Sequence, residues 1–445
     1  MEEARMHIAM YPWLAFGHIS PFVLLANKLA QRGHRISIFI PTRTQSKLQH
    51  MNLHPHLITF IPITVPHVEG LVPRSAETTS DVDPSRSPFL MAAMDHTQKQ
   101  VEDLLIQLKP NIVFFDFTHW LPDLARPLGI KSVQYWISGL VMTAYAISRA
   151  IPSDGFPDKS IRLHKHEEKM FEMMKKIDSG SGVSFLARHT LGARSADAIA
   201  YRSCREIDGP FADYVEKMSG RRILLTGPVI PPEAQTSTLE PKWDHWLAGF
   251  KHDSVIYCAF GSECVLEVSQ FKELLLGLEL SGMPFFAAVK PPKGCDSVEA
   301  GFPEGFEERV RGRGIVHGGW VQQQLILKHP SVGCFITHCG ASSMLEALLS
   351  HCQLVFLPSI PDQTFIARMY GQSLRAGVEV KKGEEDGLFT KESVCEAVKS
   401  VMDEESEIAK EVRENHAKLK NILLRDNLEF NYIDNFCHQL QDLLK

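Results

Sequence analysis

The chain has 445 residues, and because a single hydrophobic core stops growing near about 250 to 300 residues, this length predicts two domains. Hydrophobic residues make up 44% of the chain and charged residues 22%, a balance typical of globular proteins rather than of disordered or membrane-spanning chains. With 47 Lys and Arg against 53 Asp and Glu, the formal charge is −6. This charge argues against a nucleic acid or an anionic membrane as partner, and small or neutral molecules are expected instead.

The first residues predict neither a signal peptide nor a membrane span, because acids, Arg5, His7 and Pro12 interrupt them. No later run approaches about 18 consecutive apolar residues, so no integral membrane segment is expected. The nine cysteines are odd in number and form no CxxC pair. Scattered cysteines of this kind indicate reduced thiols, and we expect a cytoplasmic protein.

Ten short apolar runs, each a candidate β-strand, alternate with longer segments of helical periodicity. This alternation predicts parallel sheets covered by helices on both faces, and two sets of runs predict two α/β domains. In such sheets ligands bind beyond the carboxyl ends of the strands. The first set is residues 6–10, 36–40, 111–115, 132–136, 197–201 and 222–226, and the second is 254–259, 284–289, 332–336 and 353–357.

A segment rich in Pro, Ser and Thr separates the two sets and is interpreted as an interdomain linker, at residues 229–242. The boundaries that follow are a first domain at 1–228 and a second at 243–427. Residues 428–445 close the chain with an amphipathic helix.

His18 stands after the first strand, before an apolar helical stripe. Ser20 is interpreted as the cap of that helix and Pro21 as its first-turn proline, which places His18 in the strand-to-helix loop. A helix N-terminus disfavours a charged imidazole, so His18 is a candidate base, and Asp116, directly after another strand, is a candidate to orient it. The alternative is that both residues only cap backbone groups. Further candidates nearby are His119, Asp123 and Ser138.

The second cluster lies in the segment from Trp320 to Gln363. After the strand at 332–336, the sequence THCGASS predicts a turn at Gly340 and a helix capped by Ser342 or Ser343, whose free N–H groups make a phosphate site. His338 adds a hydrogen bond to the same anion. Glu346 lies one turn further and can reach ribose hydroxyls.

Three further features complete a site whose parts follow the order of a nucleotide sugar: base, ribose, diphosphate and sugar. Trp320 offers a flat surface for a base. Asp362 and Gln363, after the last strand of the segment, suit sugar hydroxyls, and Ser262, in the sequence FGSE, adds a phosphate contact. Each residue alone has a structural alternative, as packing, cap, turn or solvated side chain, but their joint order indicates a nucleotide-sugar site.

Two patterns resemble metal sites and are interpreted otherwise. Asp81 and Asp83 form a DxD sequence in a loop without a preceding strand, so they are expected to be solvated. Cysteines and histidines between 334 and 352 alternate in direction along strand and helix rather than converge. No metal and no cofactor is expected.

The chain resembles the plant family of UDP-dependent glycosyltransferases of specialised metabolism. The resemblance rests on a 44-residue box that opens with W and Q at Trp320 and Gln323, contains HP, THCG and Glu346, and closes with DQ at Gln363. The sequences FGHISP and FGSE match elsewhere, so the likeness covers the whole chain. It implies a GT-B fold, two Rossmann-like domains facing a central cleft, with the acceptor on the first, the UDP-sugar on the second, and the last helix returning to the first.

The same resemblance implies a role for each matching residue. His18 would be the base and Asp116 its orienting partner, Trp320 would stack on uracil, and Gln323 and Glu346 would hold the ribose. Ser262, His338 and Ser343 would bind the diphosphate, and Asp362 and Gln363 the transferred sugar. Ser138 is the candidate contact to the acceptor.

One departure narrows the expected substrate. The family usually has Trp-Asn after HCG, whereas this chain has Ala341 and Ser342. Small residues there resemble the subgroup that adds a sugar to the sugar of a flavonoid or anthocyanin glycoside, with glucose, xylose, rhamnose, galactose or arabinose donors. We therefore expect an inverting, monomeric transferase that displaces UDP directly. The alternatives are transfer to a flavonoid or terpenoid aglycone and a catalytically silent UDP-sugar-binding protein.

Overall fold

The computed structural model describes residues 5–151, 155–232 and 238–445, and these divide into two compact units. Unit 1 contains residues 1–156, 171–231 and 426–445, and unit 2 contains 157–170 and 232–425. Residues 157–170, assigned to the first domain from the sequence, therefore belong to unit 2. Part of the predicted linker, at 233–237, lies outside the described residues, and α10 (Pro241–Leu247) begins inside its C-terminal end.

Unit 1 is built on a seven-stranded sheet in the order β3-β2-β1-β4-β5-β6-β7, with every described pairing parallel. Its strands are β1 (His7–Tyr11), β2 (Arg35–Pro41), β3 (Ile58–Ile63), β4 (Ile112–Phe115), β5 (Lys131–Trp136), β6 (Ala198–Tyr201) and β7 (Ile223–Leu225). Its helices are α1 (Phe16–Ala30), α2 (Gln45–Leu48), α3 (Ser87–Asp95), α4 (Gln98–Leu108), α5 (Leu121–Ala125), α6 (Leu140–Ala150), α8 (Phe185–Ser195), α9 (Arg205–Ser219) and α18 (Leu428–Asp442), while α7 (Lys165–Lys176) is divided between the units.

Both faces of the central strands of this sheet are buried, which explains why β1 from Ile8 to Tyr11 and the whole of β4 are apolar. In β1, Ile8 and Met10 pack into the cluster that holds α1 and α18, whereas Ala9 and Tyr11 pack into the cluster that holds α3 and α4. Successive strand residues point to opposite faces, so a strand covered on both sides needs apolar residues at every position.

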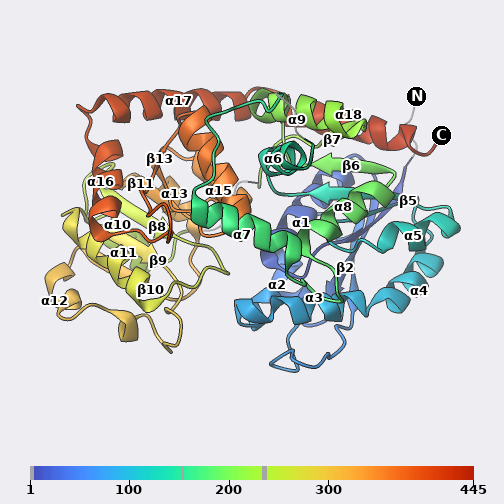
Figure 1. The fold of residues 1–445 in the computed structure, drawn as a ribbon, viewed down its shortest axis with the longest axis horizontal. Coiled ribbons are helices and arrows are strands. Elements are labelled where there is room, and N and C mark those ends of the chain that lie inside the picture. The colour runs from blue at the N-terminus through green and yellow to red at the C-terminus, as the bar shows by residue number, and fades with distance from the viewer. Residues whose placement is uncertain (1–4, 152–154, 233–237) are drawn as a thin grey trace. The chain divides into compact units, whose positions relative to one another are not determined.

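The C-terminal helix α18 is part of unit 1 and lies beside β7 (Figure 1). Ile433, Phe436 and Leu440 on this helix are fully buried, and burial of each such side chain contributes about 1.5 to 3 kcal/mol. Lys28 of α1 and Arg32, which follows this helix, also pair with carboxylates of α18, at 2.7 Å and 2.9 Å. These contacts attach the end of the chain to unit 1.

Unit 2 is built on a six-stranded sheet in the order β10-β9-β8-β11-β12-β13, and all its described pairings are also parallel. Its strands are β8 (Val255–Ala259), β9 (Phe285–Ala288), β10 (Gly314–His317), β11 (Val332–Thr337), β12 (Gln353–Phe356) and β13 (Val378–Glu379). Its helices are α10, α11 (Val268–Leu280), α12 (Phe306–Val310), α13 (Gln323–Lys328), α14 (Ala341–Leu349), α15 (Pro361–Arg368), α16 (Lys391–Met402) and α17 (Glu407–Leu423).

All ten predicted strands are confirmed, and three described strands were not predicted, namely β3, β10 and β13. Each of the three is an edge strand of its sheet. Edge strands lack a neighbour on one side and keep partly exposed residues, as in β3 and β10. They therefore lack the continuous apolar run that marks a central strand.

Two predicted helix starts are wrong. α1 begins at Phe16, with Ala15 as its cap, so His18 lies in the first helical turn and Pro21 lies inside the helix. Pro21 removes only the bond that its missing N–H would make four residues back, to Gly17. In α14 the cap is Gly340 rather than a serine, and the left-handed residue is Cys339, with φ of 66°.

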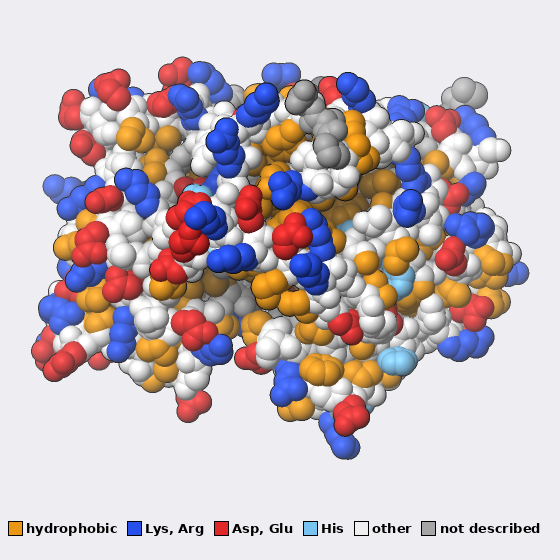
Figure 2. All heavy atoms as spheres, in the orientation of Figure 1, with side chains coloured by type: hydrophobic (Ala, Val, Ile, Leu, Met, Phe, Trp, Pro, Cys, Tyr) orange, Lys and Arg blue, Asp and Glu red, His pale blue; other side chains and the backbone are white. Residues whose placement is uncertain are grey.

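Two surface properties bear on partners. On the face drawn in Figure 2, Lys and Arg side chains are interspersed with Asp and Glu and form no single basic patch. Among the described residues, no helix combines the length and apolar character needed to span a membrane.

Candidate active site

His18 and Asp116, 98 positions apart, meet in unit 1. β1 and β4 are neighbours, with Tyr11 opposite Phe115, so the residues that follow these strands emerge side by side. His18 Nδ1 lies 2.8 Å from Asp116 Oδ2, and since an ionised carboxylate can only accept, Nδ1–H is the donor. The structure therefore brings the predicted base and its predicted partner into contact.

The Asp116 carboxylate is held by more than the imidazole. Its side chain is 5% exposed, Oδ2 accepts from Trp13 N at 3.0 Å, and Oδ1 accepts from Phe117 N at 2.7 Å. The His18 side chain keeps 24% of its surface exposed. With Nδ1 committed to the carboxylate, Nε2 is the nitrogen left to accept a proton, which is the arrangement of a carboxylate-oriented general base.

An aromatic cluster that had not been predicted surrounds this pair. The Phe117 ring lies 5.2 Å from the His18 ring, 5.1 Å from Phe185 and 4.8 Å from His189. Trp13 packs against Phe117 at 6.1 Å. The one available signal was position, because Phe117 directly follows Asp116 at a strand end.

The other candidates in unit 1 have structural partners or lie in a loop. His119 Nδ1 lies 3.4 Å from the Arg188 guanidinium, and burial together with that cation lowers the pKa of His119. Asp123 forms an exposed ion pair with Arg126 at 2.9 Å. Ser138 lies in the loop between β5 and α6 and is partly exposed.

In unit 2, Gln323 and Glu346 are joined by a hydrogen bond. Gln323 Nε2 donates to Glu346 Oε2 at 2.6 Å and to Ser343 Oγ at 3.3 Å. Two partners had not been predicted: Gln324 Nε2 donates to Glu346 Oε1 at 3.0 Å, and the Tyr257 hydroxyl donates to Gln323 Oε1 at 3.3 Å. Three predicted donor-binding residues thus form one network across α13 and α14.

His338 lies between two glycines where β11 leads into α14. A Cβ added to Gly340 would lie 2.6 Å from His338 Nε2, and one added to Gly261 would lie 2.9 Å from it, so the imidazole fits only because both residues are glycine. Burial lowers the pKa of His338 to about 4, and a hydrogen bond with the Ala259 backbone offsets part of that effect. A neutral imidazole beside a helix N-terminus can donate a hydrogen bond to an anion.

Three serines were also predicted at this anion site. Ser262 is exposed in the turn after β8, and Ser342 and Ser343 lie in the first turn of α14 instead of capping it. The N-terminal N–H groups of α14 are the feature that matches the predicted phosphate site.

Trp320 is 80% exposed, in the connection from β10 to α13. An indole this exposed gains little from packing, so it is free to stack on a ligand. Asp362 and Gln363 lie in the first turn of α15, after β12. Gln363 Oε1 accepts from both Ser359 N and Ser359 Oγ at 3.0 Å, which leaves its Nε2 as a donor; Ser359 had not been predicted.

The sequences set aside as metal sites have structural roles. Asp81 and Asp83 accept backbone N–H bonds at the starts of two short 3-10 helices. A different group, His164, His166 and Glu167, is the one set among the described residues whose possible ligand atoms lie within 4.8 Å of one another. Both oxygens of Glu167 accept from Arg368 Nη2, at 2.9 Å and 3.0 Å, so this carboxylate is already neutralised.

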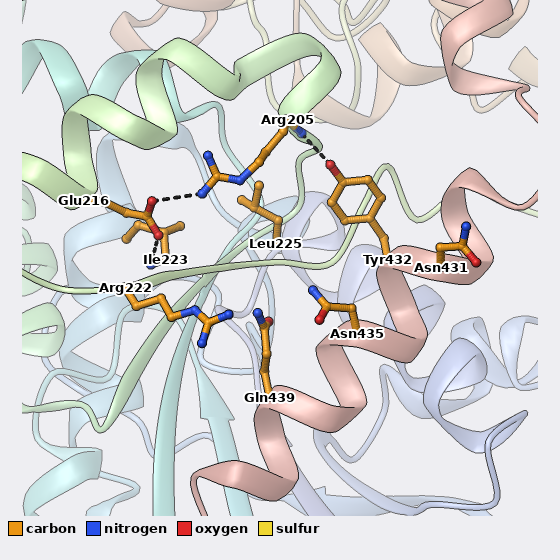
Figure 3. Close-up of a pocket in the computed structure, with 9 residues that line it drawn as sticks. All are labelled: Arg205, Glu216, Arg222, Ile223, Leu225, Asn431, Tyr432, Asn435 and Gln439. Atoms are coloured by element: carbon orange, nitrogen blue, oxygen red, sulfur yellow. Dashed lines mark hydrogen bonds and ion pairs between the residues drawn. The ribbon is translucent and has the colours of Figure 1, made fainter.

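A pocket of about 340 Å³ lies elsewhere in unit 1, between α9, β7 and α18 (Figure 3). It contains none of the predicted site residues. Arg205 pairs with Asp213 and with Glu216, and its backbone N–H donates to the Tyr432 hydroxyl at 2.8 Å. Most of these polar groups form hydrogen bonds or ion pairs with one another, so we interpret the pocket as part of the surface on which α18 packs.

The whole length of the chain is similar to known proteins. The family model for UDP-glucoronosyl and UDP-glucosyl transferase matches residues 312–422. A cyanidin 3-O-galactoside 2''-O-xylosyltransferase of Actinidia chinensis var. chinensis is 56% identical over 100% of both chains. An anthocyanidin 3-O-glucoside 2''-O-glucosyltransferase of Ipomoea nil is 53% identical, covering 100% of this chain and 99% of the relative.

Solved structures show the fold. UGT89C1 of Arabidopsis thaliana complexed with UDP-L-rhamnose superposes with a TM-score of 0.79 at 20% identity, covering 98% of this chain and 99% of that one. UGT73P12 of Glycyrrhiza uralensis complexed with glycyrrhetinic acid 3-O-monoglucuronide gives 0.80 at 19% identity, covering 99% and 96%. The predicted class, two Rossmann-like α/β domains of the GT-B type, is confirmed.

Proposed function

The chain belongs to the family of UDP-glucoronosyl and UDP-glucosyl transferases and is a UDP-dependent glycosyltransferase, and we propose that it adds a sugar to a sugar hydroxyl of an anthocyanin or flavonoid glycoside. The observation that carries the mechanism is the contact of His18 Nδ1 with Asp116 Oδ2 at 2.8 Å. It sets up one nitrogen as a proton acceptor and stabilises the imidazolium that forms.

The reaction proceeds by direct displacement. His18 Nε2 takes the proton of the acceptor hydroxyl as its oxygen attacks the anomeric carbon in line, and the bond to the UDP oxygen breaks. An α-linked donor then gives a β-linked product. Asp116 keeps its negative charge and holds the imidazolium until the proton is released.

The donor is held by unit 2. Trp320 stacks on uracil, Gln323 and Glu346 bind the ribose, and Asp362 and Gln363 bind the transferred sugar. The diphosphate lies at the start of α14, against the side chains of Ser262, His338, Ser342 and Ser343 and the backbone of Gly340. What supports this assignment is the network that joins Gln323, Ser343 and Glu346.

Hydrogen bonds at the helix N-terminus stabilise the departing UDP, so the proposed reaction needs no metal or cofactor. The uncharged His338 fits this role as a donor. Rates measured with excess EDTA and with added Mg²⁺ test the point, and a rate abolished by EDTA and restored by Mg²⁺ would refute it.

The acceptor is inferred from the relatives, two of which are named for transfer to position 2'' of cyanidin or anthocyanidin 3-O-glycosides at 56% and 53% identity. UDP-glucose, UDP-xylose, UDP-galactose, UDP-rhamnose and UDP-arabinose, each assayed with anthocyanidin 3-O-glycosides and with free flavonoids, identify the substrates. Mass spectrometry counts the sugars, and nuclear magnetic resonance of the product identifies the linked hydroxyl. Products formed only from free flavonoids would refute the proposal and favour an aglycone transferase.

A silent UDP-sugar-binding protein is separated from an enzyme by the same experiment. The enzyme is expected to lose transfer in His18→Ala while it retains UDP binding. Wild-type protein that binds UDP but transfers no sugar to any acceptor of the panel would favour the silent protein.

Two further expectations complete the proposal. None of the nine cysteines, all of which lie among the described residues, forms a disulfide. This suits the reducing cytoplasm, and imaging of a fluorescent fusion tests that location. Light scattering tests the expected monomer.

A further inference from the structure

A buried imidazole in unit 1, that of His189 on α8, lacks hydrogen-bond partners among the described residues. His189 is 7% exposed, and both of its ring nitrogens are covered and unpaired. Nε1 of Trp136, whose ring stacks on it, is also buried and unpaired. The desolvation cost of several such groups is large beside the net stability of a domain, so each calls for an explanation.

The imidazole lies close to the proposed base. Its ring stacks on Trp136 at 3.6 Å and 19°, and meets the rings of Phe117 and Phe185 at 4.8 Å and 4.6 Å. Phe117 in turn lies 5.2 Å from the ring of His18. A single aromatic side chain therefore bridges His189 and the residue that takes the acceptor proton.

A loosely held helix does not explain why the His189 imidazole lacks hydrogen-bond partners among the described residues. Arg188, the preceding residue of α8, is fully buried and donates to Asp95 through both terminal nitrogens, at 2.9 Å and 2.5 Å, and to Gly180 O at 2.5 Å. The helix is thus anchored beside the unpaired imidazole.

The chemistry of the imidazole points to a neutral ligand. Burial, with a smaller contribution from His18, lowers the pKa of His189 well below its usual value. A neutral imidazole offers one N–H donor and one acceptor nitrogen, a combination that a hydroxyl group matches and an anion does not. The aromatic rings around it suit a flat aromatic ligand.

We propose that His189 recognises the aromatic part of the acceptor, by a hydrogen bond between its imidazole and a phenolic hydroxyl, while the hydroxyl to be glycosylated lies at His18. The Nε1–H group of Trp136 supplies a second hydrogen-bond donor to the same aromatic part of the acceptor. Because these nitrogens are buried in the free chain, neighbouring side chains must shift to admit the acceptor. The inference rests on the proposed function, because it divides the acceptor into a reacting sugar hydroxyl and an aromatic ring.

The test uses His189→Phe, which keeps a stacking ring and removes both nitrogens. Because the variant loses unpaired buried groups, its melting temperature is expected to equal or exceed that of the wild type. Its KM for an anthocyanidin 3-O-glycoside is expected to rise tenfold to hundredfold, with UDP affinity and kcat at saturating acceptor unchanged. Trp136→Phe is expected to raise the same KM by a smaller factor.

The matched control is His416→Phe, since His416 is equally buried but its Nε2 bonds to Leu348 O at 3.1 Å, in unit 2. The control is expected to lower the melting temperature and leave the acceptor KM unchanged. If His189 were purely structural, His189→Phe would behave like this control. We expect the reverse, namely an unchanged or higher melting temperature and a raised KM for the acceptor.

A second experiment uses a series of flavonoid 3-O-glucosides, each of which lacks one ring hydroxyl. Wild-type protein is expected to discriminate against one member of the series at least tenfold, and His189→Phe to lose that discrimination. An acceptor KM within twofold of wild type in His189→Phe overturns the inference whatever the melting temperature does. If the wild type transfers no sugar to any glycoside, the proposed function fails instead, and acceptor binding measured by quenching of tryptophan fluorescence still tests His189.

Discussion

Asp116→Asn is the substitution that tests the proposed base most directly. The carboxylate accepts three hydrogen bonds, from Trp13 N, Phe117 N and His18 Nδ1, through two oxygens. An asparagine has one oxygen and one NH₂ group. If that oxygen keeps Phe117 N, the NH₂ group lies where Oδ2 was and faces two N–H donors. His18 then adopts the tautomer with the proton on Nε2, which cannot accept another proton.

The expected loss follows from general-base catalysis, which contributes about 10² to 10⁴-fold. We therefore expect kcat to fall by about 10² to 10⁴-fold, equal to about 2.7 to 5.4 kcal/mol of transition-state stabilisation. The switched His18 tautomer accepts from the new NH₂ group, so the bond of Trp13 N to the buried charge is the one lost without replacement, and stability is expected to fall by about 1.5 to 3 kcal/mol. Initial rates, with UDP released as the readout, and chemical denaturation measure the two effects.

The control is UDP affinity by calorimetry, which is expected to stay unchanged because the residues proposed to bind the donor lie in unit 2. In a double variant with His18→Ala, the losses are expected not to add, since the aspartate acts through the histidine. A kcat of Asp116→Asn within threefold of wild type, in a folded protein, would refute the assignment of His18 as an oriented base.

Three further predictions concern other parts of the molecule. Gly340→Ala places a Cβ 2.6 Å from His338 Nε2, so UDP affinity is expected to fall at least tenfold; an unchanged affinity by calorimetry would contradict the packing argument. Glu346→Ala is expected to weaken UDP binding by about 10 to 100-fold, because hydrogen bonds to a charged group are lost. It is expected to leave unchanged the affinity for UDP that lacks the ribose 2' and 3' hydroxyls, whereas Trp320→Ala is expected to weaken the binding of both ligands. Burial raises the pKa of Asp208 from its usual 3.8 to about 6, so ionisation favours the unfolded chain and its cost grows as pH rises from about 4 to about 6. Asp208→Asn is therefore expected to gain up to about 3 kcal/mol above pH 6 relative to pH 4, and a gain equal at both pH values would contradict it.

The predicted donor site was placed by the order of a known motif. The resemblance to a known family put Gln323 and Glu346 together at the ribose, and they meet at 2.6 Å. Each follows or flanks a strand of one parallel sheet, so regular strand and helix geometry was enough to bring them close. Gln324 and Ser359 were missed because amide and hydroxyl side chains on a helix or loop carry no pattern of their own.

The helix starts mark where that reasoning failed. Ser20 with Pro21 is a good local start signal, yet α1 begins at Phe16. The buried contacts of Ile19 and Phe22 with the sheet extend the helix by a turn, because tertiary packing outweighs a capping preference of about 1 kcal/mol.

The alternation of apolar runs and helices could be predicted from the order of residues alone, and with it two parallel sheets and the residues at their carboxyl ends. This prediction is possible because strand burial and helix periodicity are local properties, repeated every two or 3.6 residues. Which of these residues meet depends on the folded arrangement of the strands and helices. His18 faces Asp116 because β1 and β4 are neighbours, and His189 lies unpaired between Trp136 and Phe117 because α8 packs there; contacts between such distant segments depend on the packing of the whole unit, which no short stretch of sequence records.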